Sequence, residues 1–189
     1  MALAKAAGSP PPLRLFFALW PDERVRRALA ALGATLKREC GGREMDAGNL
    51  HATLAFLGNV PADQVDAFVG LAEGLNGERF ELALDSVGYW RHNRIVWAGA
   101  TEVPAPLSGL ADRMREAVRA LRWPVDERPY VPHITLLRDA RHGPQQRNAA
   151  LPVWPVDEFV LVSSTHTDNG VRYAPLKRWR LGITPSAER

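Results

Sequence analysis

Residues 49–58 read "NLHATLAFLG", a stretch in which side chains of two kinds alternate with a period of two. As a β-strand, it places His51 and Thr53 on the same face, because successive side chains point to opposite sides of a strand. The opposite face is apolar and carries Leu50, Ala52, Leu54 and Phe56. The stretch therefore predicts a strand with one face in the core and a histidine and a threonine on the other.

The same pattern returns in residues 132–139, "PHITLLRD". There His133 and Thr135 share one face, and Ile134 and Leu136 share the other. Each copy continues with leucine, so that His-x-Thr-Leu occurs twice in the chain. One His-x-Thr match means little, but two copies on strands with apolar opposite faces indicate the two walls of one site.

The residue types of these walls indicate acid–base chemistry on a phosphate. Histidine, with an ordinary pKa near 6.5, can accept or donate a proton near neutral pH, so two imidazoles can act as base and acid. A threonine two residues on lies ~6 to 7 Å along the strand, where its hydroxyl can donate to a phosphate oxygen. Arg138 adds a guanidinium suited to bidentate phosphate contact. We therefore predict attack on a phosphodiester.

Other kinds of site fit the sequence less well. A zinc site needs three or four ligands, whereas each His-x-Thr supplies one, and Asp139 near His133 completes no ligand set. Neither the G-x-S-x-G of a serine hydrolase nor the phosphate-binding loop G-x-x-x-x-G-K-[ST] occurs. The remaining histidines stand alone and are interpreted as structural; they are His92, His142 and His166.

Elsewhere, apolar periodicity predicts an α+β fold. Residues 13–20 form a short apolar run typical of a buried strand, and helical spacing follows Asp22 up to Gly41. The expected order is strand, helix, strand, helix, two strands, helix and three strands, the last two linked by a turn at residues 168–170. This order lacks the regular alternation of a doubly wound parallel sheet, which favours α+β.

Composition limits the class of protein. The 189 residues are 46% hydrophobic, with a net charge of +3, one cysteine (Cys40) and no run of basic residues. No run approaches the ~18 apolar residues of a membrane span, and the first segment lacks the apolar region of a signal peptide. We expect a cytoplasmic monomer with a flexible leader (1–12), one domain (13–182) and a short tail (183–189).

Both motifs resemble the paired His-x-Thr motifs of the 2H phosphoesterases, in particular the bacterial RNA 2′,3′-cyclic phosphodiesterase branch, historically called 2′-5′ RNA ligases. Three other stretches resemble that branch: "RLFFAL" at 14–19, "RIVWAG" at 94–99 and "RYAPLKRW" at 172–179. The resemblance extends over residues 13–181, nearly the whole expected domain. It implies a bilobal α+β fold, in which two antiparallel sheets line a central cleft with helices on the outer faces.

The resemblance also implies roles for the motif residues. His51 would be the proton donor to the leaving ribose oxygen, and His133 the proton acceptor that activates water. Thr53 and Thr135 would bind phosphate oxygens, and Arg138 matches the arginine that follows the second motif of the family. No metal or cofactor is implied, and the product would be a 2′-phosphomonoester.

Substrate identity is less defined by the sequence. The partner would be an RNA end or a small nucleotide bearing a cyclic phosphate, and a splayed base could stack on an aromatic ring. The candidate rings are Phe16, Phe17, Tyr130 and Tyr173. Three alternative functions stay open: 2′-5′ RNA ligation by the same groups, hydrolysis of small cyclic nucleotides, and RNA-end binding without catalysis.

Overall fold

The computed structural model describes residues 10–168 and 170–182, so residues 1–9 of the expected leader, Asn169 of the expected turn and the tail 183–189 lie outside the described part. Its elements are β1 (Leu13–Leu19), α1 (Glu23–Cys40), β2 (Arg43–Glu44), the 3-10 helix η1 (Ala47–Asn49), β3 (Ala52–Val60), η2 (Ala62–Gln64), α2 (Val65–Glu73), β4 (Phe80–Leu82), β5 (Ser86–Trp90), β6 (Ile95–Gly99), α3 (Ala105–Ala120), β7 (His133–Arg138), β8 (Trp154–Val156), β9 (Glu158–Thr167) and β10 (Gly170–Arg180).

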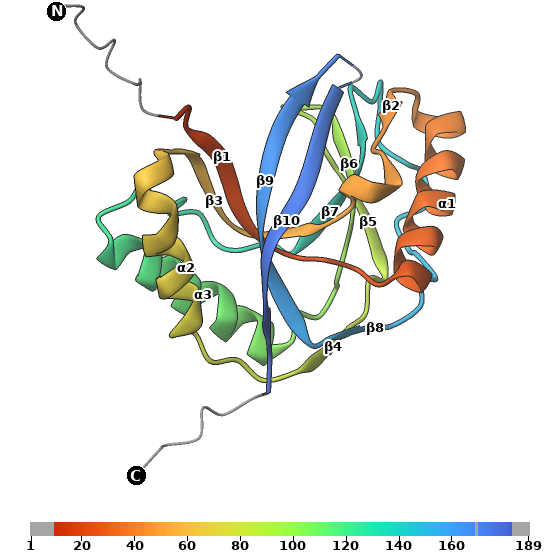
Figure 1. Cartoon of the computed structure of the whole chain (residues 1–189). Coiled ribbons are helices and arrows are strands. Elements are labelled where there is room, and N and C mark those ends of the chain that lie inside the picture. The colour runs from red at the N-terminus through yellow and green to blue at the C-terminus, as the bar shows by residue number, and fades with distance from the viewer. Residues whose placement is uncertain (1–9, 169, 183–189) are drawn as a thin grey trace, which may run out of the picture.

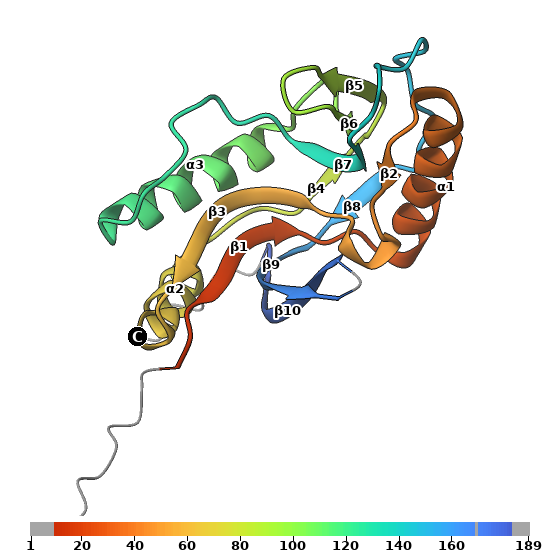
Figure 2. The same cartoon turned by 90° about the horizontal axis from the view of Figure 1, so that it is seen from above.

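The strands form one large antiparallel sheet in the order β10-β9-β1-β3-β7-β6-β5, with β2 paired to β7, and a small sheet of β4 and β8. Helix α1 packs against β7 and β2, whereas α3 packs against β3 and α2 against β10. Figures 1 and 2 show α1 on one side of the molecule and the α2–α3 pair on the other. The α+β class is therefore confirmed, and helices lie on the outer side of each half.

A single residue pair, Ala52 with Ile134, joins β3 to β7 and with them the two halves of the large sheet. By contrast, β1 and β3 pair along their whole length, and β6 pairs with β7 from Val96 to Gly99. The two expected sheets are thus distinct halves that meet at one point. Both partners of this pair lie one residue after a motif histidine.

Local sequence explains the positions of the first two elements. The carboxylate of Asp22 accepts a hydrogen bond of 2.8 Å from the amide of Val25 and so caps α1, and Gly41, with a φ of 68°, ends it. Strand β1 is apolar from Leu15 to Leu19 because both faces are covered there: Phe17 lies in the main core, and Phe16 packs in a smaller cluster with Val160 and Val162.

The expected position of Phe56 on the core face of β3 is wrong. In the pairing of β1 with β3, a shift beyond Phe56 leaves Leu57 as an extra residue, and the shift before it, between Ala18, opposite Thr53, and Phe17, opposite Ala55, leaves Leu54 as the extra residue of a β-bulge. The bulge turns the side chain of Phe56 outward, where it is 50% exposed, while Leu54 and Leu57 stay buried. Strict alternation therefore holds only over the first part of the strand.

The described part of the chain contains no helix with the length and apolar character needed to cross a bilayer.

Two glycines give the indole ring of Trp97 a place against the sheet. A Cβ atom on Gly88 would lie 2.0 Å from Cζ2 of Trp97, and one on Gly99 would lie 2.6 Å from its Cζ3. The ring centroid of Trp97 is 5.3 Å from that of Trp90. The missing side chains at Gly88 and Gly99 therefore let Trp97 lie beneath Trp90.

We expect Gly88→Ala to lower the free energy of unfolding by ~1–3 kcal/mol, because the added methyl group overlaps the Trp97 ring and forces it to move. Urea denaturation measures the loss. The matched control is Gly70→Ala in α2, where an added Cβ meets no atom within 4 Å. This control should be stabilised by up to ~1 kcal/mol through helix propensity. Equal effects of the two substitutions would contradict the packing argument.

Candidate active site

Both polar motif faces line one cavity of about 720 Å³. His51 and Thr53 reach it from the start of β3, and His133, Thr135 and Arg138 reach it from β7. The pairing of Ala52 with Ile134 places Thr53 opposite His133 and His51 opposite Thr135 when the antiparallel register is extended by one residue. The two histidines are thus diagonal neighbours across the junction, which in a regular sheet is a separation of ~7–8 Å. The space between them has the scale of a phosphate group.

The ring of His51 is fixed by two hydrogen bonds. Its Nδ1 lies 2.7 Å from the carbonyl oxygen of Asn49, and its Nε2 lies 3.1 Å from Oγ1 of Thr53. Because a carbonyl oxygen can only accept, Nδ1 carries the proton. In the neutral ring, Nε2 then accepts from the hydroxyl of Thr53.

His133 repeats this arrangement. Its Nδ1 lies 2.8 Å from the carbonyl oxygen of Val131. Val131 is two residues before His133, just as Asn49 is two residues before His51. The proton on Nδ1 leaves Nε2 as the nitrogen without a hydrogen in the neutral ring. Both histidines are therefore held in the tautomer whose Nε2 can accept a proton.

Asn49 ties the first motif to the β9–β10 hairpin. Its Nδ2 donates to the carbonyl oxygen of Val171 at 2.7 Å, and its Oδ1 accepts from the amide of Tyr173 at 3.0 Å. Asn49 is 9% exposed, and its backbone oxygen accepts the hydrogen bond from His51. This residue therefore links the hairpin to the orientation of the imidazole.

Aromatic rings surround both imidazoles. Around His51, Trp20 stacks at 5.9 Å and 16°, while Phe16 and Tyr173 have ring centroids at 4.7 and 5.1 Å. Trp90 meets His133 edge-on, with a centroid distance of 4.5 Å. The apolar surroundings are more complete at His51, so its charged form loses more hydration.

The electrostatics follow from this burial. Burial lowers the pKa of His51 to about 4, helped by the charges of His133 and Arg138 and opposed by the hydrogen bond to Asn49. Burial, followed by the charge of Arg138, also lowers the pKa of His133 below its ordinary 6.5. In the free protein, both imidazoles are therefore neutral at physiological pH, and the cavity favours an anion.

The four expected base-stacking rings have different positions. Phe17 is fully buried and packs against Phe159 and Trp179, so it cannot reach a ligand, and this expectation is wrong. Phe16 is 3% exposed and supports His51. Both tyrosines line the cavity. Their role in base stacking stays a prediction.

Sequence reasoning did not identify three residues that shape the site, namely Asn49, Trp20 and Trp90. Asn49 carried no signal of its own, because its counterpart two residues before His133 is Val131 and its side-chain partners lie on the distant β9–β10 hairpin. No local signal marked Trp20, just after β1, or Trp90, at the end of β5, which approach the histidines from elsewhere in the chain.

The carboxylate and the histidines that could serve as metal ligands outside the two motifs have other surroundings in the structure. The carboxylate of Asp139 pairs with Arg94 at 3.0 Å. His92, expected to be structural, lies in the β5–β6 turn and lines the cavity, whereas His142 bonds the carbonyl oxygen of Gly143 through Nδ1 at 3.0 Å. Within residues 10–168 and 170–182, no three His, Cys, Asp or Glu side chains group as metal ligands would.

Comparison with known proteins gives concordant matches. The model of the LigT-like phosphoesterases matches residues 19–97 and 99–173. The RNA 2′,3′-cyclic phosphodiesterase of Escherichia coli is 38% identical, with 90% of this chain and 97% of that protein aligned. The protein of that name from Thermus thermophilus is 30% identical over 89% and 90% of the two chains. The crystal structure of Escherichia coli LigT with 3′-AMP superposes with a TM-score of 0.85 at 37% identity, covering 91% and 99%.

We expect NMR titration of the free protein to give His51 a pKa of about 4, because its imidazolium is desolvated by the surrounding rings. Added inorganic phosphate should raise the pKa of both motif histidines, since a nearby anion favours the charged ring. Arg138→Gln should also raise both values by removing a positive charge. A His51 that titrates near 6.5 in the free protein would refute control by burial.

Proposed function

The chain belongs to the LigT-like phosphoesterase family, within the 2H phosphoesterases, and from this membership we propose that it is an RNA 2′,3′-cyclic phosphodiesterase. One observation carries the proposal: both His-x-Thr pairs line a single cavity on the two sides of the Ala52–Ile134 pair. A phosphodiester needs an acid and a base on opposite sides of the phosphorus, and His51 and His133 would take these roles. The names of two relatives and the 3′-AMP bound to Escherichia coli LigT support the choice of substrate.

The proposed reaction consumes one water and uses no metal. Nε2 of His133 takes a proton from water as the water oxygen forms a bond to phosphorus. The bond from phosphorus to the ribose 3′ oxygen breaks, and Nε2 of His51 gives its proton to that oxygen. The product is a 2′-phosphomonoester, and proton exchange with solvent returns both rings to their starting states.

The donor role requires His51 to gain a proton that it lacks in the free protein. An anionic phosphate in the cavity provides the reason, because it stabilises an imidazolium beside it and raises its pKa. Protonated Nε2 can no longer accept from Thr53, which frees that hydroxyl to donate to a phosphate oxygen. Substrate binding would thus charge the acid and release a phosphate ligand together.

Arg138 and Thr135 complete the phosphate site in this proposal. Both line the cavity from β7, and Arg138 is close enough to lower the pKa of both histidines. The guanidinium that opposes protonation in the free protein would be neutralised by the phosphate. Arg138 would therefore bind the substrate and couple its arrival to protonation of His51.

We expect His51→Ala and His133→Ala each to lower turnover by ~10²-fold or more on an oligoribonucleotide ending in a 2′,3′-cyclic phosphate, because each removes one proton-transfer group. The double variant should be little slower than either single one, since the two groups act as a unit. Phosphorus NMR of the wild-type product should show the 2′-phosphomonoester.

Two controls accompany this assay. His142→Ala removes a histidine that bonds a neighbouring carbonyl and does not line the cavity, so it should leave turnover unchanged. Activity should also persist in excess EDTA. Near-normal turnover in either motif variant would contradict the pairing, a 3′-phosphate product would reverse the donor and acceptor, and loss in EDTA restored by a divalent cation would refute the metal-free route.

The pH dependence should differ between the two kinetic parameters. The profile of kcat/KM reports the free enzyme, so we expect a bell with one limb near 4 and the other below 6.5. The profile of kcat reports the complex, in which the phosphate raises both pKa values, so its optimum should lie at higher pH. Such profiles report the pair of histidines as a unit. A kcat/KM optimum above 6.5 would contradict this reasoning.

A further inference from the structure

Phe56 places an exposed aromatic ring in the wall of the same cavity as the histidines. At 50% exposure, it is the one aromatic among the exposed large hydrophobic residues of the described chain. The bulge in β3 places Phe56 on the cavity face of the strand, so the backbone conformation determines that the ring is exposed. It stands five residues beyond His51, which is ~13–17 Å along the strand and beyond the reacting phosphate.

Arg14 lies over this ring, with Cζ of its guanidinium 4.8 Å from the ring centroid. It lines the cavity from the start of β1. No hydrogen bond or ion pair engages this guanidinium within residues 10–168 and 170–182. A cation beside an aromatic ring, with N–H groups that no carboxylate in the described chain engages, suits a phosphate oxygen next to a stacked base.

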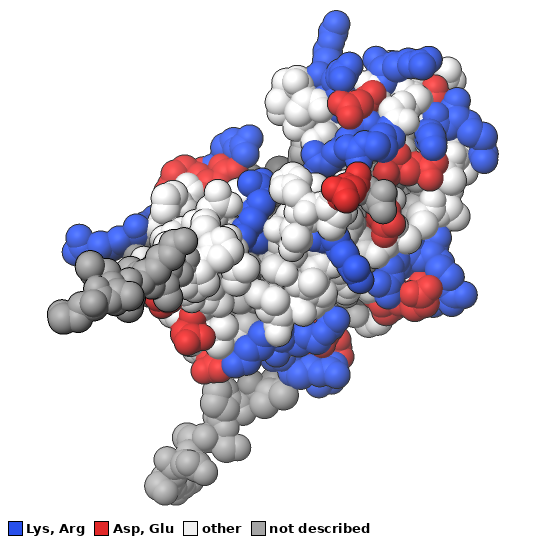
Figure 3. Space-filling model, turned by 45° about the horizontal axis from the view of Figure 1, so that its top comes forward, with Lys and Arg blue, Asp and Glu red and all other residues white. Residues whose placement is uncertain are grey.

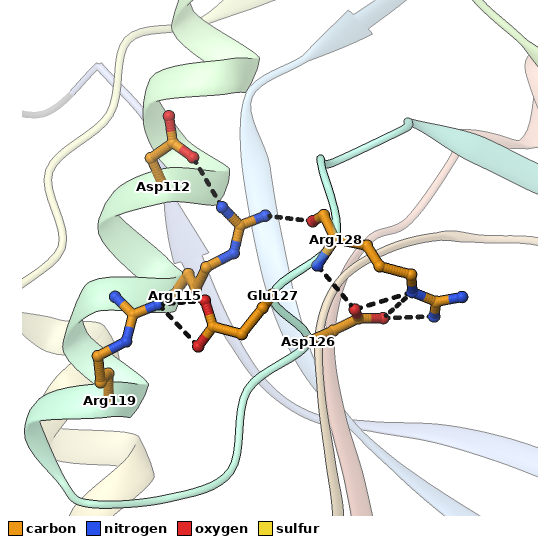
Figure 4. Close-up of polar contacts among 6 residues, drawn as sticks. All are labelled: Asp112, Arg115, Arg119, Asp126, Glu127 and Arg128. Carbon is orange, nitrogen blue, oxygen red and sulfur yellow. Dashed lines mark hydrogen bonds and ion pairs between the residues drawn. The ribbon is translucent and has the colours of Figure 1, made fainter.

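The facing wall is the segment between α3 and β7, held in place by α3 (Figure 4). Arg115 donates to the carbonyl oxygen of Arg128 at 3.4 Å, and Arg119 bonds the carboxylate of Glu127 at 2.9 Å. The guanidinium of Arg128 is paired with Asp126, so its charge is largely offset. The wall is thus fixed in position, and Arg14 is the cation at this end that no carboxylate offsets in the described chain.

The rest of the visible surface gives little reason to place RNA elsewhere. On the face shown in Figure 3, basic and acidic side chains are interspersed, with no continuous stripe of one sign. A strand of RNA would therefore gain most from contacts inside the cavity. Sequence-tolerant binding of single strands commonly combines an aromatic platform with a nearby cation, as Phe56 and Arg14 do.

We propose that Phe56 and Arg14 form a subsite for an upstream nucleotide of single-stranded RNA, whose base stacks on the part of the Phe56 ring that Arg14 leaves exposed while Arg14 contacts its phosphate. The inference rests on the proposed function for the position of the RNA end between His51 and His133. It makes the preferred substrate an oligonucleotide, because a single nucleotide with its phosphate at the histidines does not extend to Phe56.

The test compares kcat/KM on a short oligoribonucleotide ending in a 2′,3′-cyclic phosphate with kcat/KM on a nucleoside 2′,3′-cyclic phosphate. The ratio of the two is the length preference. We expect Phe56→Ala to lower the length preference about 10-fold, the loss of one stacked base, and Phe56→Trp to restore it. Arg14→Gln should reduce the slope of log affinity against log salt by about 0.7, the value for one phosphate contact on a single strand.

Matched controls use exposed residues outside the cavity. Leu176→Ala changes a 48% exposed apolar side chain on β10, and Arg27→Gln changes a guanidinium on α1 that is 75% exposed. Both should keep the wild-type length preference. A wild-type enzyme without length preference, or equal ratios in Phe56→Ala and Leu176→Ala, would overturn the subsite and leave the proposed function standing.

A binding measurement separates the two proposals. Fluorescence anisotropy with a labelled oligoribonucleotide ending in a 2′-phosphate needs no turnover. If neither cyclic phosphate is hydrolysed but Phe56→Ala still weakens binding about 10-fold, the subsite stands and the proposed function fails. If Phe56→Ala binds this probe as tightly as Leu176→Ala does, the subsite is refuted.

Discussion

The pairing of Ala52 with Ile134 is the constraint on which the site depends, because it alone joins β3 to β7. Each partner follows a motif histidine, so this single contact fixes the relative positions of the two His-x-Thr pairs. A longer ladder would bring the strands side by side and fill the space between the histidines with neighbouring side chains. A sheet that parts on both sides of one pair instead leaves a cavity with one motif on each wall. Each half has its own helical covering, α1 on one and α2 with α3 on the other.

Burial of the histidines gives the cavity its response to charge. The rings packed around His51 remove water from the imidazole, which disfavours its protonated form and makes a compensating anion necessary. Backbone carbonyl oxygens fix the tautomer of both histidines in the same way. The neutral state of the imidazoles is therefore a consequence of the packing. The negative charge of a bound phosphate would favour their protonated form. The catalytic proton and the substrate would then arrive in the site as linked events.

Departures from regular strand geometry also serve this site. The bulge in β3 moves Phe56 from the core side to the cavity wall, and Gly88 and Gly99 let Trp97 lie beneath Trp90, which in turn contacts His133. In the first place a bulge, and in the second a pair of glycines, determines where an aromatic ring lies in relation to the cavity. Regular alternation would have placed Phe56 on the core face, and side chains at Gly88 and Gly99 would have displaced Trp97.

The sequence by itself determined the α+β class, α1 with its cap at Asp22, and the presence of two histidines and two threonines on strand faces opposite to the core. These features depend on periodicity and on contacts between near neighbours, which a sequence displays directly. It could not determine that Phe17 is buried, that Phe56 is exposed, or that Trp20 and Trp90 lie against the histidines. Those outcomes depend on strand register, a bulge and the approach of distant segments. Only the tertiary structure decided them, because the burial of a side chain, and the pKa that follows from it, is set by neighbours that come from elsewhere in the chain.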